Sequence, residues 1–203
     1  MTDDRLKAPA AARNRDPILN VLRGVLPEAG TVLEVASGSG EHVLHFAAHL
    51  PKLTFCPSDP SPEARRSIAA WIEASGAANI RPPLALDAAA PHWPLESADA
   101  ILCINMIHIS PWAATQGLFA GAGALLPPGA PLYLYGPYKR HGAHTAESNA
   151  AFDASLRAQN AEWGVRDLEA VAACAASAGF EAPLVVAMPA NNLSVIFRRK
   201  TTK

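Results

Sequence analysis

Three acidic residues and two glycines in the first half of the chain have types and spacing suited to binding a small molecule. Glu34, Gly38 and Gly40 belong to the stretch TVLEVASGSGEHVLHF, in which an apolar strand leads through a turn into a helix. Asp59 follows Gly40 by 19 residues, and Asp87 lies further on in LALDAAAP. Glycines permit a tight turn and let a ligand approach the main chain closely.

The residues around the two glycines favour one class of cofactor over another. A dinucleotide-binding loop reads G-x-G-x-x-G, and its third glycine is replaced here by Val43. The carboxylate of Glu34 would repel phosphates but would pair with an ammonium group. S-adenosylmethionine (SAM) carries an ammonium, a sulfonium, a ribose and an adenine, and no phosphate. The loop therefore favours SAM over NAD.

The other two acids fit the rest of that cofactor. A carboxylate at the position of Asp59 can bind both ribose hydroxyls. Asp87 can accept a hydrogen bond from the adenine amino group. Each acid alone would suit a surface cap or turn, but the ordered series at the ends of three successive strands matches three donor groups of SAM.

Alternating strands and helices position these residues. We expect strands at Thr31–Val35, Leu53–Cys56, Ile80–Leu86, Ala98–Asn105 and Pro131–Gly136, then a closing pair at Leu184–Met188 and Leu193–Arg198. Helices are expected at Arg15–Leu26, Glu41–Leu50, Glu63–Ser75, Trp112–Leu126, Ala150–Asn160 and Arg166–Ala178. This alternation predicts an α/β fold with a mostly parallel sheet, helices on both faces and a ligand site at the carboxyl ends of the strands.

Several stretches resemble a known family. VLEVASGSG, SDPS, LALDA, AILCINMIHIS and the closing hairpin are similar to class I SAM-dependent methyltransferases. NRDPILNVL, GPYKRHGAHTAESNAAFDASLRAQNAEWGVRDLEAV and MPANN resemble a small methyltransferase-like family long catalogued as a domain of unknown function. The resemblance implies one Rossmann-like domain over residues 14–203, preceded by a flexible segment, 1–13. It also implies a seven-stranded sheet whose antiparallel last strand is inserted beside the fifth.

The resemblance also implies which residues bind the cofactor. Glu34, Ala36, Gly38 and Gly40 would form the loop on the methionine side, and Ala36 departs from the usual first glycine of that loop. Asp59 would bind the ribose and Asp87 the adenine. The set is completed by Asn14, Ala88 and Asn105.

Methyl transfer from a sulfonium is an in-line displacement, so positioning and desolvation can supply much of the rate. A base is needed only where the acceptor must lose a proton, and His108, three residues after Asn105, is the candidate. A histidine packed beside the following helix start is the equal alternative. Amino-group methyltransferases often carry Asn/Asp-Pro-Pro-aromatic after the fourth strand, and NMIH at this place argues against a nucleic-acid substrate.

Acceptor-binding residues are expected around the later strands. Tyr138, His141 and His144 lie in a long segment that predicts either a lid over the acceptor or a solvated loop. The turn PANN suits Asn residues for backbone reasons, but Asn192 could also point at the acceptor. The predicted acceptor site comprises Trp112, Tyr138, His141 and Asn192.

Composition excludes several other functions. The 17 Lys+Arg and 18 Asp+Glu leave a net charge of −1, which gives no attraction to nucleic acid or anionic membrane. No signal peptide or membrane-spanning run is recognisable, and three unpaired cysteines fit the cytoplasm. No metal site is expected, because HFAAH lacks the glutamate of the zinc-protease motif and His141-x-x-His144 lacks further ligands. The sequence favours a SAM-dependent methyltransferase for a small molecule over a nicotinamide oxidoreductase or a non-catalytic SAM-binding module.

Overall fold

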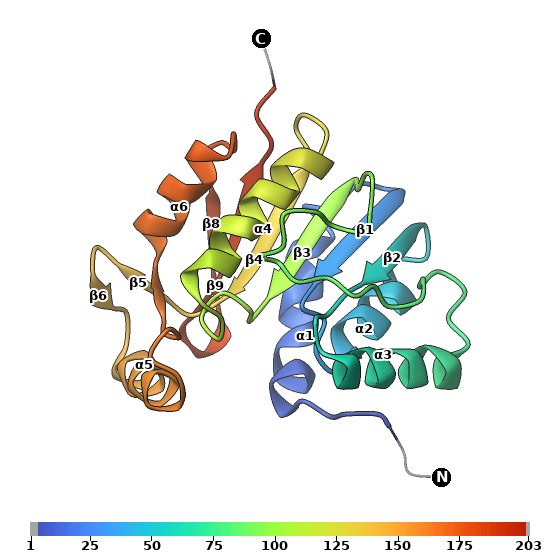
Figure 1. The fold of residues 1–203 in the computed structure, drawn as a ribbon, viewed down its shortest axis with the longest axis horizontal. Coiled ribbons are helices and arrows are strands. Elements are labelled where there is room, and N and C mark those ends of the chain that lie inside the picture. The colour runs from blue at the N-terminus through green and yellow to red at the C-terminus, as the bar shows by residue number, and fades with distance from the viewer. Residues whose placement is uncertain (1–3, 202–203) are drawn as a thin grey trace.

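The computed structural model describes residues 4–201, which form an α/β fold around a six-stranded sheet (Figure 1). The spatial order of the strands is β2-β1-β3-β4-β9-β8. Their bounds are β1 Gly30–Val35, β2 Leu53–Pro57, β3 Ala100–Ile104, β4 Pro131–Gly136, β8 Leu184–Met188 and β9 Asn192–Arg198. The helices are α1 Pro9–Leu22, α2 Glu41–His49, α3 Pro62–Ser75, α4 Trp112–Leu125, α5 Glu147–Gln159 and α6 Leu168–Ser177.

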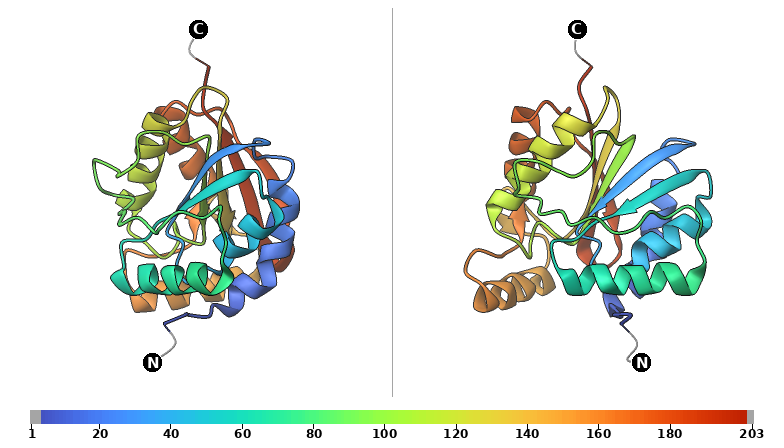
Figure 2. Two further views of the ribbon diagram at one scale, coloured as in Figure 1. Left: turned by 90° about the vertical axis from the view of Figure 1, so that its right-hand side faces the viewer. Right: turned by 45° about the vertical axis from the view of Figure 1, so that its right-hand side comes forward.

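The first four strands are parallel, and helices cover both faces of the sheet as predicted. Figure 2 shows α1 and α2 on one side and α4 and α6 on the other, with α3 along the lower edge. Two apolar clusters fill the spaces between these layers. One joins α1 and α2 to the sheet through Ile18, Leu22 and Phe46, and the other joins α4 and α6 to it through Phe119 and Phe180. The carboxyl ends of β1, β2 and β3 therefore meet at one edge, the lower edge in Figure 1.

The closing hairpin has the predicted topology. β9 is inserted between β4 and β8 and runs antiparallel to both. Consequently β8 is parallel to β4, and the turn Pro189–Asn191 lies at the same edge as the carboxyl ends of β1 and β3.

The predicted strand Ile80–Leu86 does not form, so the sheet has six strands and not seven. This segment touches β2 only through isolated bridges, Phe55 with Ile80 and Ser58 with Leu84. Pro82 and Pro83 lie between the two bridges and have no backbone N–H to donate. The chain therefore follows the sheet edge without joining it as a regular strand.

The first helix begins earlier than predicted. Asp16 and Pro17 resemble a cap and a first-turn proline, but Pro17 lies inside α1, which begins at Pro9. Ala8 is the N-cap, and Ala11 is buried. Residues 9–13, assigned from sequence to a flexible segment, are thus helical. The first three residues of that segment lie outside the described part of the chain.

A second, three-stranded sheet follows β4 and was not predicted. It consists of β5 (Tyr138–Arg140), β6 (Ala143–His144) and β7 (Arg166–Asp167), in the order β6-β5-β7. Together with α5 it forms a unit of residues 138–167, which we call the insert. Figure 1 shows the insert beyond the β9 side of the main sheet, with α5 at the lower edge.

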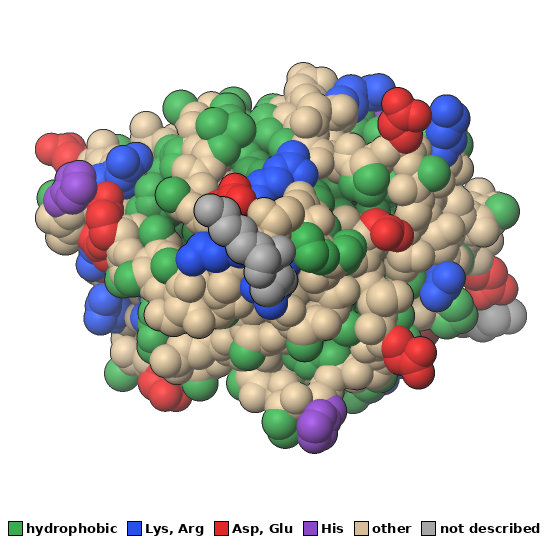
Figure 3. Space-filling view, turned by 90° about the horizontal axis from the view of Figure 1, so that it is seen from above, with side chains coloured by type: hydrophobic (Ala, Val, Ile, Leu, Met, Phe, Trp, Pro, Cys, Tyr) green, Lys and Arg blue, Asp and Glu red, His purple; other side chains and the backbone are tan. Residues whose placement is uncertain are grey.

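The opposite edge, seen from above in Figure 3, carries acidic and basic side chains interspersed with hydrophobic ones. No single charge dominates this face, as the net charge of −1 leads one to expect. Among residues 4–201, no helix has the length and apolar character needed to cross a lipid bilayer.

Candidate functional site

A cavity of about 700 Å³ lies at the carboxyl ends of β1, β2 and β3. Six of the residues predicted to bind the cofactor line it: Ala36, Gly38, Asp59, Asp87, Ala88 and Asn105. The rest of the wall comes mainly from the start of α1, the first turn of α2 and the loop after β3. Segments distant in sequence thus converge at the edge that strand topology predicts.

The two glycines of the loop have different roles. Gly38 has φ +57° and open space where a side chain would be, on the side facing the cavity. Gly40 has φ +92°, and a Cβ there would lie 3.1 Å from the backbone of Ile68 in α3. Gly40 therefore permits close packing of α2 against α3, and it does not line the cavity. Ala36 also has positive φ, +57°, which explains why glycine is the usual residue at this position.

Asp59 and Asp87 both line the cavity, but their carboxylates differ in burial and in the number of hydrogen bonds that orient them. Asp59 is buried, with Oδ2 accepting from the Gly38 N–H at 3.0 Å and Oδ1 from the Ser61 N–H at 2.9 Å. Each oxygen retains a further lone pair. Asp87 is exposed and accepts from the Ala89 N–H at 2.9 Å, as in an Asx-turn. Asp59 is therefore the more rigidly oriented of the two.

Glu34 ends β1 but lies behind the cavity wall. Its side chain is buried, and Oε2 has no hydrogen-bond partner among the described residues. Burial raises the pKa of this carboxyl to about 7; a hydrogen bond from Ser37 opposes the shift and the charge of Asp59 adds to it. Glu34 is thus a buried carboxyl that is partly ionised near pH 7, and the residues that follow it in the sequence line the cavity.

Asn14, the remaining predicted cofactor residue, acts on the cavity through a neighbour. Its Oδ1 lies 2.7 Å from Nε2 of His42, and His42 lines the cavity. Burial raises the pKa of Tyr135, near the end of β4, and the nearby side chains of Asn14 and Asn192 oppose this shift. His42 was not among the predicted site residues, and the structure places it in the cavity wall.

His108, the predicted base, lies outside the cavity wall. It is buried against Gly136, and its ring meets Phe152 edge-on at 5.6 Å. Burial lowers its pKa to about 4, with a smaller contribution from the charge of Arg166. The packing alternative that the sequence left open describes this environment better, and a role as base stays a prediction.

The four predicted acceptor-binding residues also lie outside the wall. Tyr138 is buried in the core, and the side chain of His141 is 81% exposed beside Glu169. Trp112 packs under the guanidinium of Arg166. The Nδ2 group of Asn192 donates to the carbonyls of Pro189 and Ala190, which is the turn-shaping role. Part of the cavity wall is formed instead by residues that were not predicted, namely Met106, Ile109, Ser110, Pro111 and Trp163.

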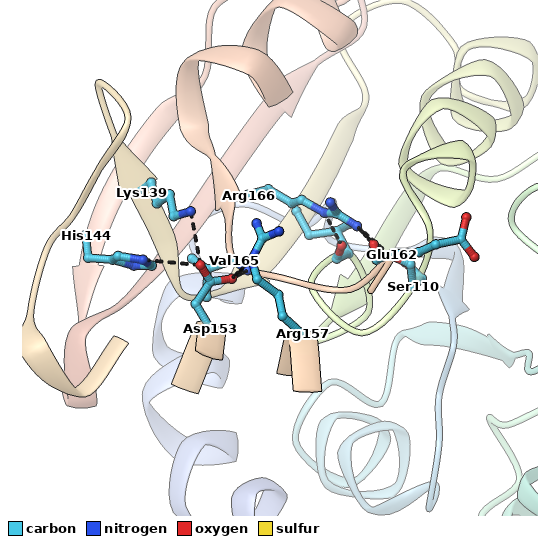
Figure 4. Close-up of polar contacts among 9 residues, drawn as sticks. Ser110, Lys139, His144, Asp153, Arg157, Glu162, Val165 and Arg166 are labelled. Carbon is cyan, nitrogen blue, oxygen red and sulfur yellow. Dashed lines mark hydrogen bonds and ion pairs between the residues drawn. The ribbon is translucent and has the colours of Figure 1, made fainter. Parts of the chain in front are cut away.

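Arg166 contacts the residue that precedes Trp163, and Trp163 lines the cavity. From β7 its guanidinium donates to the carbonyls of Ile107 at 3.0 Å, Ser110 at 2.6 Å and Glu162 at 2.7 Å. The first two belong to the loop after β3, and the third precedes Trp163 (Figure 4). One side chain therefore joins the insert to the loop after β3, which lines the cavity.

Asp153 in α5 holds the insert itself together. Lys139, His144 and Arg157 lie 3.1, 3.2 and 3.2 Å from its carboxylate, and the Val165 N–H donates to it at 2.7 Å. Figure 4 shows these groups converging on Asp153 from the strands, the helix and the loop. We call these five residues the Asp153 cluster.

A family comparison assigns almost the whole chain. Residues 5–199 match the family described as "Protein of unknown function (DUF938)". The chain belongs to the DUF938 family. Its fold is that of class I SAM-dependent methyltransferases, as predicted.

Solved structures resemble this DUF938 chain at low sequence identity. An O-methyltransferase family protein from Burkholderia thailandensis has a TM-score of 0.81 at 18% identity, over 96% of this chain and 58% of that one. Human N-acetylserotonin methyltransferase, solved with SAM, has 0.78 at 16%, over 95% and 53%. An O-methyltransferase family 2 protein from Planctomyces limnophilus, solved with apigenin, has 0.74 at 21%, over 97% and 63%. The DUF938 chain thus spans little more than half the length of these proteins.

Within residues 4–201 of the DUF938 chain, no three His, Cys, Asp or Glu side chains are grouped so as to hold a metal ion. On α2, Nε2 of His45 lies 2.9 Å from a carboxylate oxygen of Asp16, and its ring is tilted against that of His49 with 4.4 Å between the centroids. These contacts use the histidines as ordinary surface partners.

Proposed function

We propose that this protein is a SAM-dependent methyltransferase that transfers a methyl group to a small-molecule acceptor. The observation that carries the proposal is the cavity at the carboxyl ends of β1, β2 and β3, in which Gly38, Asp59, Asp87 and Asn105 come together. In parallel α/β sheets ligands bind at this edge.

The residues present fit SAM. Asp59 is fixed by two backbone N–H groups and retains acceptor capacity for ribose hydroxyls. Asp87 is free to meet the adenine amino group. The unpartnered Oε2 of Glu34 adjoins the loop where the ammonium would lie. Bound SAM would supply a methyl group on a sulfonium, and the chain's own contribution is to orient it and exclude water.

The acceptor side favours an uncharged, largely apolar molecule. None of the residues lining the cavity within the described chain is Lys or Arg, so a phosphate or carboxylate on the acceptor has no guanidinium or ammonium partner there. Ile109 and Trp163 offer apolar surface instead. The relatives named for N-acetylserotonin and solved with apigenin support this proposal, because both names describe small organic molecules.

We also propose a cytoplasmic location. Cys56, Cys103 and Cys174 are all free thiols, and the first two are buried. Unpaired buried thiols are typical of proteins from a reducing compartment.

Calorimetry with SAM, S-adenosylhomocysteine and NADH tests the cofactor. We expect binding of the first two and none of NADH; preference for NADH would favour the oxidoreductase alternative. The Asp59→Ala variant should bind S-adenosylhomocysteine more weakly by over about 1 kcal/mol, the value of a lost hydrogen bond. Asp87→Ala, an exposed acid of the same wall, is the matched control and should lose less.

Methyl transfer is tested separately, with methyl-labelled SAM and a pool of neutral aromatic and aliphatic metabolites. Labelled product would establish turnover. Binding of SAM without any labelled product from the pools would favour the non-catalytic module.

A further inference from the structure

The proposed cofactor has two charged ends on its amino-acid part, and the carboxylate end still lacks an assigned partner. A carboxylate leaving water needs a donor, preferably a charged one. Of the side chains that line the cavity in the described chain, only His42 can carry a positive charge. The other polar members of the wall are serines, Asn105 and the two acids Asp59 and Asp87.

His42 is held in one orientation at the first turn of α2. Its Nε2 lies 2.7 Å from Oδ1 of Asn14, and its ring stacks on Phe46 at 5.7 Å between centroids. Because an amide oxygen only accepts hydrogen bonds, Nε2 carries the proton of this pair. Nδ1 is left free, with no partner among residues 4–201.

Arg15, the next residue along α1, does not line the cavity, but its charge acts on His42. Its Nε is buried with no hydrogen-bond partner, and no side chain in the described chain forms an ion pair with it. Its charge reaches His42, since burial, His45 and Arg15 together lower the pKa of His42 to about 4. A buried guanidinium nitrogen without a partner is costly, and a nearby anion would offset that cost.

We propose that His42 binds the carboxylate of the methionine part of SAM, and that Arg15 acts as a positioning residue whose charge strengthens this contact. The inference rests on the proposed function. With no anion beside it the imidazole is neutral at pH 7. A carboxylate against Nδ1 favours its protonation, which supplies a charged donor on each side of the ring. Asn14 fixes the ring from behind.

An acceptor carrying a carboxylate would suit the same corner, so the experiment must separate the two sources. 5′-Methylthioadenosine shares the adenosine and thioether of S-adenosylhomocysteine but has no amino-acid group. Comparing these two ligands isolates the amino-acid end of the cofactor and requires no acceptor.

Calorimetry with both ligands is carried out on the wild type, His42→Ala, Arg15→Gln, Arg15→Lys and Arg13→Gln. We expect His42→Ala to weaken S-adenosylhomocysteine at least about tenfold, as for a lost charge-assisted hydrogen bond, and to leave methylthioadenosine unchanged. Arg15→Gln should give a smaller loss for the same ligand, and Arg15→Lys should restore most of it. Arg13, exposed on the same helix, is the control for net charge.

Unchanged S-adenosylhomocysteine affinity in His42→Ala would overturn the proposal and leave the corner to an acceptor. Equal losses for both ligands would overturn it as well, because the residue would then only shape the cavity. Failure of the wild type to bind either ligand would instead count against the proposed function. Methylthioadenosine binding also reports that each variant is folded.

Discussion

The sheet side of the cavity and the insert are stabilised in opposite ways. Near the cavity, one apolar cluster from α1 and α2 packs against the sheet, and β1 carries a buried acid, Glu34, whose Oε2 has no hydrogen-bond partner among the described residues. The insert has a small core, and the Asp153 cluster joins its helix, strands and loop through ion pairs and hydrogen bonds. The apolar packing accommodates the buried carboxyl of Glu34, whereas the insert depends on an ionised Asp153.

The two acids also respond oppositely to pH. At Asp153 burial raises the pKa, but hydrogen bonds from Lys139 and Val165 and the charges of Lys139 and Arg157 outweigh it and hold the pKa below 3.8. This contribution to stability is present above pH 3.8 and is lost as pH falls through the folded-state pKa. At Glu34 the pKa is raised, so the folded state is penalised as pH rises from 4.5 to about 7.

The largest effect is expected for Asp153→Ala. Removing this carboxylate leaves Lys139, His144 and Arg157 facing one another, which should reduce the free energy of unfolding by about 4 kcal/mol. Urea unfolding at pH 7 measures the loss. At pH 3 the wild type should approach the variant; a difference that persists undiminished there would contradict the ionic explanation.

Glu34→Gln should have the opposite sign. Because the wild-type acid must ionise in a buried site, the variant should be the more stable protein at pH 8, by about 3 kcal/mol. The two proteins should be equally stable near pH 4.5. A pH-independent difference between their unfolding free energies would show that ionisation of Glu34 is not its cause.

Arg166→Gln tests the contacts between the insert and the loop after β3. Loss of its bonds to the carbonyls of Ile107, Ser110 and Glu162 should cost about 2 kcal/mol, and should increase hydrogen exchange around Trp163. Lysine keeps the charge but cannot reach three carbonyls at once, so Arg166→Lys should behave similarly. Full rescue by lysine would mean that charge alone matters.

The smallest expected effect lies in the loop after β1. Ala36 at φ +57° is strained, and Ala36→Gly should raise the free energy of unfolding by about 1 kcal/mol. Ala190 has the same φ in the turn before β9, at the same edge of the sheet but beyond β4, and is the matched control. Thermal unfolding of both variants should show similar gains; no gain at either site would contradict strain as the cause.

Local patterns were sufficient for the strands that lead to the loop glycines and to Asp59. Apolar runs mark β1, β2, β3 and β4, and the parallel topology brings the glycine loop and Asp59 to one edge. Asp87 reaches the same edge on a segment that does not form the predicted strand. A local pattern also misled at Pro17, because a proline that looks like a helix start can equally lie within a helix begun earlier.

The acceptor side could not be predicted because its contacts are long-range. Arg166 meets Ile107 across 59 residues, and no sequence period connects them. Trp163, which lines the cavity, follows Glu162, whose carbonyl accepts from the same guanidinium. His42 was missed for a similar reason, since its partner Asn14 lies on a helix whose start was misplaced.

The start of the chain has a kinetic consequence for any ligand of the cavity. Ala8, Ala10 and Ala11 form part of its wall, and the residues before them are fastened at three points. The Leu6 N–H donates to Ser67, Trp71 donates to the Leu6 carbonyl, and the Ala8 N–H donates to Glu41. These three contacts hold this part of the cavity wall in place. If a ligand leaves where residues 8–11 form the wall, its residence time and the protection of residues 6–11 from proteases should lengthen and shorten together.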